Sequence, residues 1–140
     1  MDKKVCGVLS LVSLIIGMAI YFFFRDLDMV LFRFLPKPHF LAGFFIPVKP
    51  SVFSSFFLYN LPDALWFLSG ILLLRFAWFS KPHWQNIYIA CFCGIALILE
   101  TSQLSKSVPG TFDAMDLLFM ALIAFIEGLL YNTFFSRRMT

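Results

Sequence analysis

The chain has 140 residues, of which 61% are hydrophobic and only 14% are charged. Soluble domains are roughly half apolar and about a quarter charged, and a short soluble chain could not bury this much apolar surface. The composition therefore excludes an ordinary soluble domain, and the scattered basic residues behind the net charge of +3 predict no nucleic-acid partner. We expect an all-α membrane protein with about four transmembrane helices.

The first span is predicted over residues 5–24, an apolar run of 20 residues that is long enough to cross a bilayer core of about 30 Å. Lys3 and Lys4 precede the run, and Arg25 and Asp26 follow it. The run is longer than the apolar region of a signal peptide, and no small-residue cleavage site follows it. We therefore interpret residues 1–25 as an uncleaved first span.

Residues 26–60 do not form a continuous apolar run. Proline breaks helix interiors, and bare irregular backbone is not stable in the lipid core. The segment could span, re-enter or lie on the membrane, and we favour an interfacial or re-entrant segment from which Arg33 reaches the interface. The interruptions are four prolines and four basic or histidine residues: Pro36, Pro38, Pro47, Pro50, Arg33, Lys37, His39 and Lys49.

The rest of the chain, residues 61–140, is predicted to form a three-span core within a single membrane domain. Asn60 is the expected N-cap of the second span, with Pro62 and Asp63 in its first turn. Arg75 lies late in that span and is expected to extend its side chain to the interface. The predicted spans are residues 61–79, 86–103 and 113–135.

Lysines and arginines in short loops set the orientation of such proteins. One set of basic residues lies close to the ends of the predicted spans, whereas most of the others lie in a single long loop. This asymmetry places both termini in the cytoplasm. The expected cytoplasmic set is Lys3, Lys4, Arg75, Lys81, Arg137 and Arg138.

This topology brings acidic and amide side chains from three spans to the outer face of the membrane. Capping and the helix dipole could account for the three aspartates among them, with Asp116 and Asp113 in an arrangement like a capping box. The candidate ligand-binding residues are Asp63, Glu100, Gln103, Asp113 and Asp116.

Glu100 is the least expected of these residues, because a carboxylate in the last turn of a helix opposes the helix dipole. Ionisable groups near the lipid core usually face a bundle interior and have a partner. Gln103 lies on the same face of the helix, three residues later. The candidate partners of Glu100 are Arg25, Arg33 and Lys106, and a structural ion pair is the alternative to a functional role.

Glu127 is a secondary candidate because it lies near the middle of the last span. A proton-linked role is one interpretation, and a structural hydrogen bond to Ser69, to Thr101 or to water is the other. The three cysteines lie in apolar runs and supply too few ligands for a zinc site. We expect no resident cofactor, although a divalent cation could bind carboxylates in the acidic group.

The stretch from Glu100 to Leu118 resembles the VanZ-like membrane protein family. The similarity covers roughly residues 58–135, and Asp63 resembles an upstream aspartate of that family. This chain has Ala64 and Met120 where many members have lysine and asparagine, and it lacks their nearby histidine. The matching residues are Glu100-x-x-Gln103 and then Pro109-Gly110-Thr111-Phe112-Asp113-x-x-Asp116-Leu117-Leu118.

The resemblance implies a multi-pass protein of the bacterial cytoplasmic membrane that acts in the cell envelope, in a family linked to resistance to the glycopeptide antibiotic teicoplanin. The favoured function is a binding or envelope-modulating protein whose outer acidic pocket takes an amine or a lipid-linked envelope precursor. An enzyme acting on a lipid or lipid-linked substrate is an alternative, with carboxylates as acid and base or as metal ligands. A third hypothesis is that the chain is a small transporter subunit, which would have to assemble into a homo-oligomer.

Overall fold

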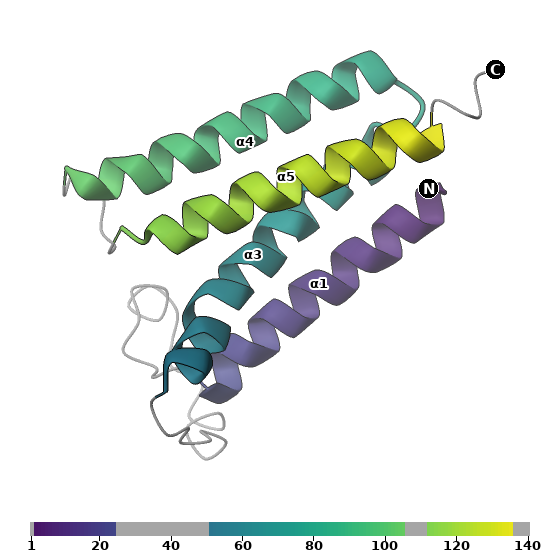
Figure 1. The fold of residues 1–140 in the computed structure, drawn as a ribbon. Coiled ribbons are helices and arrows are strands. Elements are labelled where there is room, and N and C mark those ends of the chain that lie inside the picture. Colours follow the sequence, from purple (N-terminus) through teal and green to yellow (C-terminus); the bar gives the residue numbers. More distant parts are fainter. Residues whose placement is uncertain (1, 25–50, 106–111, 136–140) are drawn as a thin grey trace, which may run out of the picture.

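The computed structural model describes residues 2–24, 51–105 and 112–135, apart from the side chains of residues 52–56 and 132–135. This part of the chain is all helical and has no strand (Figure 1). Its four helices are each long and apolar enough to cross a membrane, which confirms the prediction of a multi-pass all-α protein. They are α1 (Lys3–Phe24), α3 (Val52–Ala77), α4 (Pro82–Leu104) and α5 (Ala114–Phe135).

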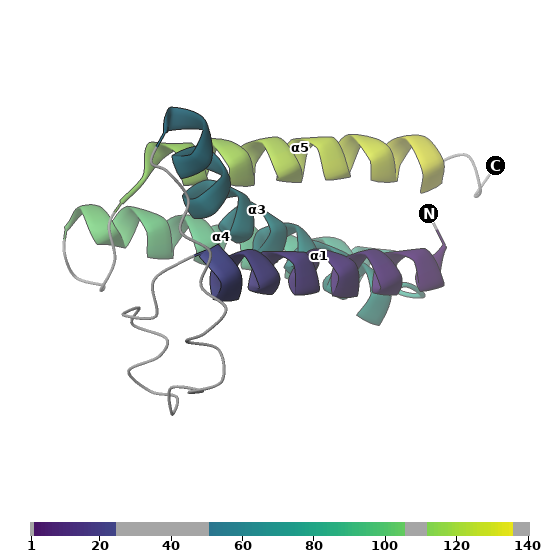
Figure 2. The same ribbon diagram turned by 90° about the horizontal axis from the view of Figure 1, so that it is seen from below.

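Helix α3 is the centre of the fold, because α1, α4 and α5 all pack against it. Figure 2 shows α5 and α1 on either side of α3. The start of α1 and the end of α5 lie at the same end of the bundle (Figure 1). We call this the lysine end, after Lys3, Lys4 and Lys81, and we call the opposite end the acidic end, after Asp63, Glu100, Asp113 and Asp116.

Small residues along one face of α1 allow it to approach α3 closely. Cys6, Ser10, Ser13 and Gly17 are the buried residues of α1, and their spacing of four, three and four places them on one face. Ser10 and Ser69 each donate a hydrogen bond from the hydroxyl to the other's carbonyl oxygen, both at 2.9 Å. These reciprocal bonds tie α1 to α3 across their interface.

Apolar side chains on α4 and α5 face outward rather than into a protein core. In each of these helices only 6% of the most apolar stretch is buried inside the bundle. Ile98 on α4 is 64% exposed, and Phe125 on α5 is 65% exposed. Such surfaces are stable in hydrocarbon and not in water, as expected for helices that cross a membrane.

The helix boundaries differ from the predicted ones mainly at α3. This helix begins at Val52, eight residues before Asn60, so the interpretation of Asn60 as an N-cap is wrong. Pro62 lies inside the helix, and neither it nor Asp63 is in the first turn. Residues 52–60 of the predicted irregular segment are therefore helical, whereas residues 26–50 lie outside the described part of the chain.

Candidate functional site

Polar side chains from three helices form a hydrogen-bonded group at the acidic end, which we call the acidic cluster. It consists of Asn60 on α3, Glu100 and Gln103 on α4, and Asp113 and Asp116 at the start of α5. Four of these five residues were predicted as candidates, and direct hydrogen bonds connect them. The alternating direction of the helices brings them to one end of the bundle (Figure 1).

The N-terminus of α5 supports the carboxylates of the acidic cluster. Asp113 Oδ1 accepts a hydrogen bond of 2.9 Å from the backbone N–H of Met115, which confirms that Asp113 is the N-cap. The N–H of Asp113 itself donates to Glu100 Oε1 at 3.1 Å. The carboxylate that completes this cap therefore comes from Glu100 on α4, and not from Asp116 as the capping-box interpretation proposed.

Among the described residues Glu100 is one of the most buried charged side chains, with 7% of its surface exposed. Its Oε2 accepts a hydrogen bond of 3.1 Å from Gln103 Nε2, from one helical turn later on α4. Both carboxylate oxygens thus have a donor, and the positive end of the α5 dipole lies beside the charge. Its three predicted partners, Arg25, Arg33 and Lys106, lie outside the described residues.

Asn60 is the member of the acidic cluster whose role the sequence did not indicate. It is only 6% exposed. Its amide Nδ2 donates to Asp113 Oδ2 and to Asp116 Oδ1, both at 2.9 Å. A single amide therefore links the two aspartates of α5 to α3. In the sequence Asn60 is an amide at the edge of an apolar run, and that position indicated a cap and not a contact between helices.

Asp63 lies three residues after Asn60, on the same side of α3, and is half-buried. With Glu100, Asp113 and Asp116 it gives the acidic end four carboxyl groups. All lysines and arginines among the described residues belong to the opposite end of the bundle: Lys3, Lys4, Arg75 and Lys81. The two other described acids, Asp2 and Glu127, lie at the lysine end, so the separation of charge along the bundle axis is complete for the basic residues and partial for the acidic ones.

The acidic cluster has more hydrogen-bond acceptors than donors. Each oxygen of Glu100 and Asp113 accepts one hydrogen bond from the described residues. A carboxylate oxygen can accept about two. The four oxygens therefore keep capacity for a donor such as an ammonium group. No group of three or more His, Cys, Asp or Glu suited to a metal ion is found in residues 2–24, 51–105 and 112–135.

A second polar network lies at the lysine end and is built around a buried ion pair. Arg75 Nε lies 2.7 Å from Glu127 Oε1, and Arg75 Nη2 lies 3.0 Å from Glu127 Oε2. Arg75 Nη1 donates to the side-chain oxygens of Gln85 and Asn86 at 2.8 and 2.9 Å. The guanidinium also stacks on the Tyr131 ring, with 3.6 Å between Cζ and the ring centroid.

This network corrects two predictions. Arg75 is 5% exposed and does not extend to the interface, because its guanidinium is held between α4 and α5. The partner of Glu127 is Arg75 and not Ser69 or Thr101, whose hydroxyls bond to Ser10 and to the backbone of α4. Because charge and hydrogen bonds are matched within the network, its geometry supports a structural role for Glu127.

The remaining residues singled out in the sequence belong to neither network as far as the structure describes them. Arg33 and His39 fall outside the described residues. His83 is exposed at the start of α4, with its ring centroid 6.1 Å from that of Trp84. The three cysteines are free thiols.

No family model, curated protein or solved structure matches the chain. Its function is therefore inferred from its residues and their geometry.

Proposed function

We propose that the chain is a VanZ-like protein of the bacterial cytoplasmic membrane whose acidic cluster binds a cationic group of a cell-envelope ligand. The observation that carries this proposal is the joining of carboxylates and amides from three helices into one part-buried, hydrogen-bonded group. Capping alone requires no contribution from Asn60 and no buried Glu100. Their presence favours a site in which the carboxylates are held in a set arrangement.

An amine is the ligand chemistry that suits this arrangement best. The oxygens of Glu100 and Asp113 have spare acceptor capacity, and an ammonium group supplies three donors and no acceptor. A positive charge would also offset the mutual repulsion of neighbouring carboxylates. Amine-bearing envelope precursors that are anchored to lipid would reach the site from the membrane surface, as would an amine-bearing glycopeptide antibiotic.

The orientation in the proposal rests on the distribution of lysines and arginines. Lys3, Lys4 and Lys81 lie at the end of the bundle opposite the acidic cluster, and Arg137 and Arg138 follow α5 in the sequence. The positive-inside rule therefore supports an outward-facing acidic cluster with both termini in the cytoplasm. The resemblance of the Glu100 and Asp113 motifs to the VanZ-like family supports a role in the envelope.

The proposal is tested by isosteric substitutions that remove charge from the acidic cluster. Glu100→Gln, Asp113→Asn and Asp116→Asn are each expected to lower resistance to teicoplanin in an expressing bacterial host, without loss of membrane abundance. Thr101→Val is the matched control, because Thr101 is exposed and its hydroxyl bonds only within α4. Full activity of all three variants at normal abundance would show that the acidic cluster is not the functional site.

Mass spectrometry of the host's envelope lipids separates binding from catalysis. A binding protein leaves these lipids chemically unchanged, which is the outcome we expect. A modified lipid that appears with the parent protein and disappears with Asp113→Asn would identify the acidic cluster as an enzyme site instead.

A further inference from the structure

A stack of aromatic rings with no assigned role joins the end of α3 to the start of α4 at the lysine end. The Trp78 ring stacks on the Tyr88 ring, with 4.6 Å between their centroids and 26° between their planes. Trp84 continues the series, with its ring centroid 6.3 Å from that of Tyr88. We call Trp78, Tyr88 and Trp84 the ring stack. Trp84 is 50% exposed and Tyr88 is 38% exposed, so the ring stack is a surface of the bundle and not part of its core.

Two lysines add positive charge at the same end of α3. Lys81 lies in the turn between α3 and α4, and its Nζ lies 6.0 Å from the centroid of the Trp78 ring. Lys3 belongs to the first turn of α1, and its Nζ lies 5.1 Å from the centroid of the Phe76 ring. A cation over an aromatic face is attracted to it. These contacts hold two positive charges, from α1 and from the turn, beside the exposed rings.

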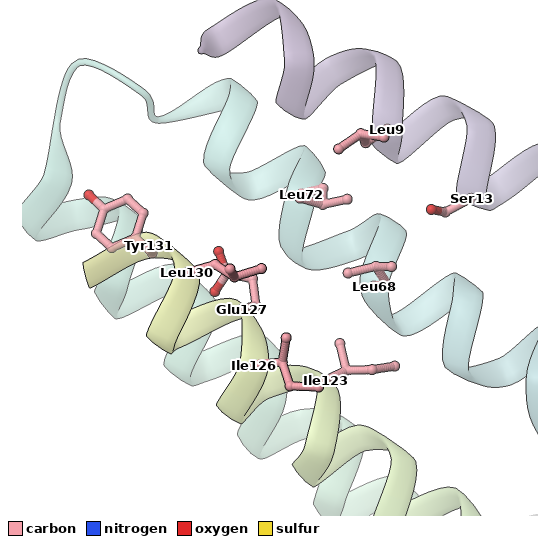
Figure 3. Close-up of a pocket in the computed structure, with 9 residues that line it drawn as sticks. All are labelled: Leu9, Ser13, Leu68, Leu72, Ile123, Ile126, Glu127, Leu130 and Tyr131. Atoms are coloured by element: carbon pink, nitrogen blue, oxygen red, sulfur yellow. The ribbon is translucent and has the colours of Figure 1, made fainter. Parts of the chain in front are cut away.

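Negative charge is sparse around this surface. The sequence has no acidic residue over positions 64–99, which include the turn, the ring stack and most of α4. Glu127 of α5 is buried and paired with Arg75, and Figure 3 shows it among the side chains that line the groove between α1 and α5. Asp2 is the other described acid at the lysine end, where the three lysines outnumber it. The surface therefore favours a partner with negative charge.

The position of the ring stack matches the headgroup layer of a membrane. Its turn joins two helices that are each long and apolar enough to cross a bilayer, so it lies near the point where they leave the hydrocarbon. Pro82 at the start of α4 and Tyr88 are six residues apart, which is about 9 Å along the helix. The headgroup layer on each side of a bilayer is about 5–8 Å thick, and tryptophan and tyrosine are enriched in it. A protein segment would have to displace lipid to reach these rings, so phospholipid headgroups are the favoured partner.

We propose that the ring stack, together with Lys3 and Lys81, binds phospholipids whose headgroup carries a net negative charge, in preference to zwitterionic ones. The two ammonium groups attract the headgroup phosphate, and the rings pack against the glycerol and the upper part of the acyl chains. A zwitterionic headgroup is bound less well, because its own cation is repelled by the lysines. This surface lies at the opposite end of the bundle from the acidic cluster and does not depend on the function proposed for that cluster.

The test measures lipid selectivity at the ring stack through tryptophan fluorescence. Trp66 is first replaced by phenylalanine, which keeps a ring beside Tyr21 and leaves Trp78 and Trp84 as the tryptophans of the chain. The full chain is placed in vesicles that mix phosphatidylglycerol and phosphatidylcholine, with bromine as a quencher in the acyl chains of one lipid or the other. We expect phosphatidylglycerol to be bound about tenfold more strongly at low salt, and less selectively at high salt. Equal quenching by the two brominated lipids would overturn the proposal.

Charge variants separate this surface from a general attraction between the lysine end and negative lipid. Lys81→Gln is expected to lower the selectivity for phosphatidylglycerol by about fivefold, whereas Lys81→Arg keeps the charge and should keep the selectivity. Lys4→Gln is the matched control, because Lys4 is an exposed lysine of the same end whose charge is not held over a ring of the described residues. It should change the selectivity by less than about twofold. Equal effects of Lys81→Gln and Lys4→Gln, or of Lys81→Gln and Lys81→Arg, would refute the proposed surface.

Discussion

Replacing Glu127 by leucine tests whether the buried ion pair stabilises the lysine end of the bundle. The substitution leaves the Arg75 guanidinium, whose side chain is 6% exposed, without its counter-charge. Breaking a buried pair in this way costs about 3–5 kcal/mol in soluble proteins. An average polar contact between membrane helices contributes only about 0.6 kcal/mol, because unfolded helices in the membrane also find partners.

We expect Glu127→Leu to lower the free energy of unfolding by about 3 kcal/mol, at the lower end of the range for buried pairs. The reason is that two hydrogen bonds and a full charge are lost together. Adding Arg75→Met should recover part of this loss, because no uncompensated charge then remains. Recovery should be incomplete, since the side-chain oxygens of Gln85 and Asn86 lose their donor.

The assay follows unfolding through the thiol of Cys6, which is 2% exposed at the contact between α1 and α3. Cys91 and Cys93 are first replaced by alanine so that only Cys6 reacts with a maleimide. The protein is titrated with sodium dodecyl sulfate in mixed micelles, and the labelling rate reports the unfolded fraction. Each variant is compared with the parent by its transition midpoint.

The double-mutant cycle provides the decisive comparison. A coupling energy of about 2 kcal/mol between Arg75 and Glu127 is expected, whereas independent sites add within about 0.5 kcal/mol. Glu127→Gln is a useful intermediate, because it keeps the shape and one acceptor but removes the charge. Additive effects of the two substitutions, or an unchanged midpoint for Glu127→Leu, would refute the structural role of the pair.

Two further predictions concern helix packing. Asn60→Leu removes the donor that the two aspartates of α5 share, and it should cost about 1.5–3 kcal/mol in the same assay, whereas an unchanged midpoint would show that the bridge contributes nothing. Gly17→Ala should cost about 1–3 kcal/mol, because a Cβ there would lie 2.6 Å from Trp66 Cδ1. Gly94→Ala is its control, since a Cβ there has nothing within 4 Å, and equal effects of the two alanines would contradict the close packing of α1 on α3.

The four long apolar helices of the described residues were predictable, because the number of such helices depends on the length of apolar runs. A run of 20 residues such as 5–24 has few alternatives to crossing the bilayer. The N-cap role of Asp113 was predictable for a similar reason, as capping depends on local sequence. The start of α3 could not be predicted in this way. Proline is common in the first turn of a helix, but Pro62 lies inside α3.

The hydrogen-bond partner of a side chain on another helix was harder to predict than the position of that side chain along its own helix. Hydropathy places Arg75 near the end of a span but does not give the rotation of α3, which turns its side chain toward Glu127 on α5. Asn60 presents the same difficulty, because its two acceptors lie more than 50 residues later in the chain. The proximity of Glu100 and Asp113 could be predicted, because consecutive spans run in opposite directions and the end of one helix therefore lies near the start of the next.

The sidedness of the acidic cluster is tested most directly by cysteine labelling in intact cells. Ser80 and Ser105 are exposed at opposite ends of α4, and each is replaced by cysteine in a chain without its native thiols. A maleimide that does not cross the membrane should label Ser105→Cys from outside and Ser80→Cys only after permeabilisation. Labelling of Ser105→Cys only from the cytoplasm would contradict an outward-facing cluster, and labelling of both positions from one side would contradict a membrane-spanning α4.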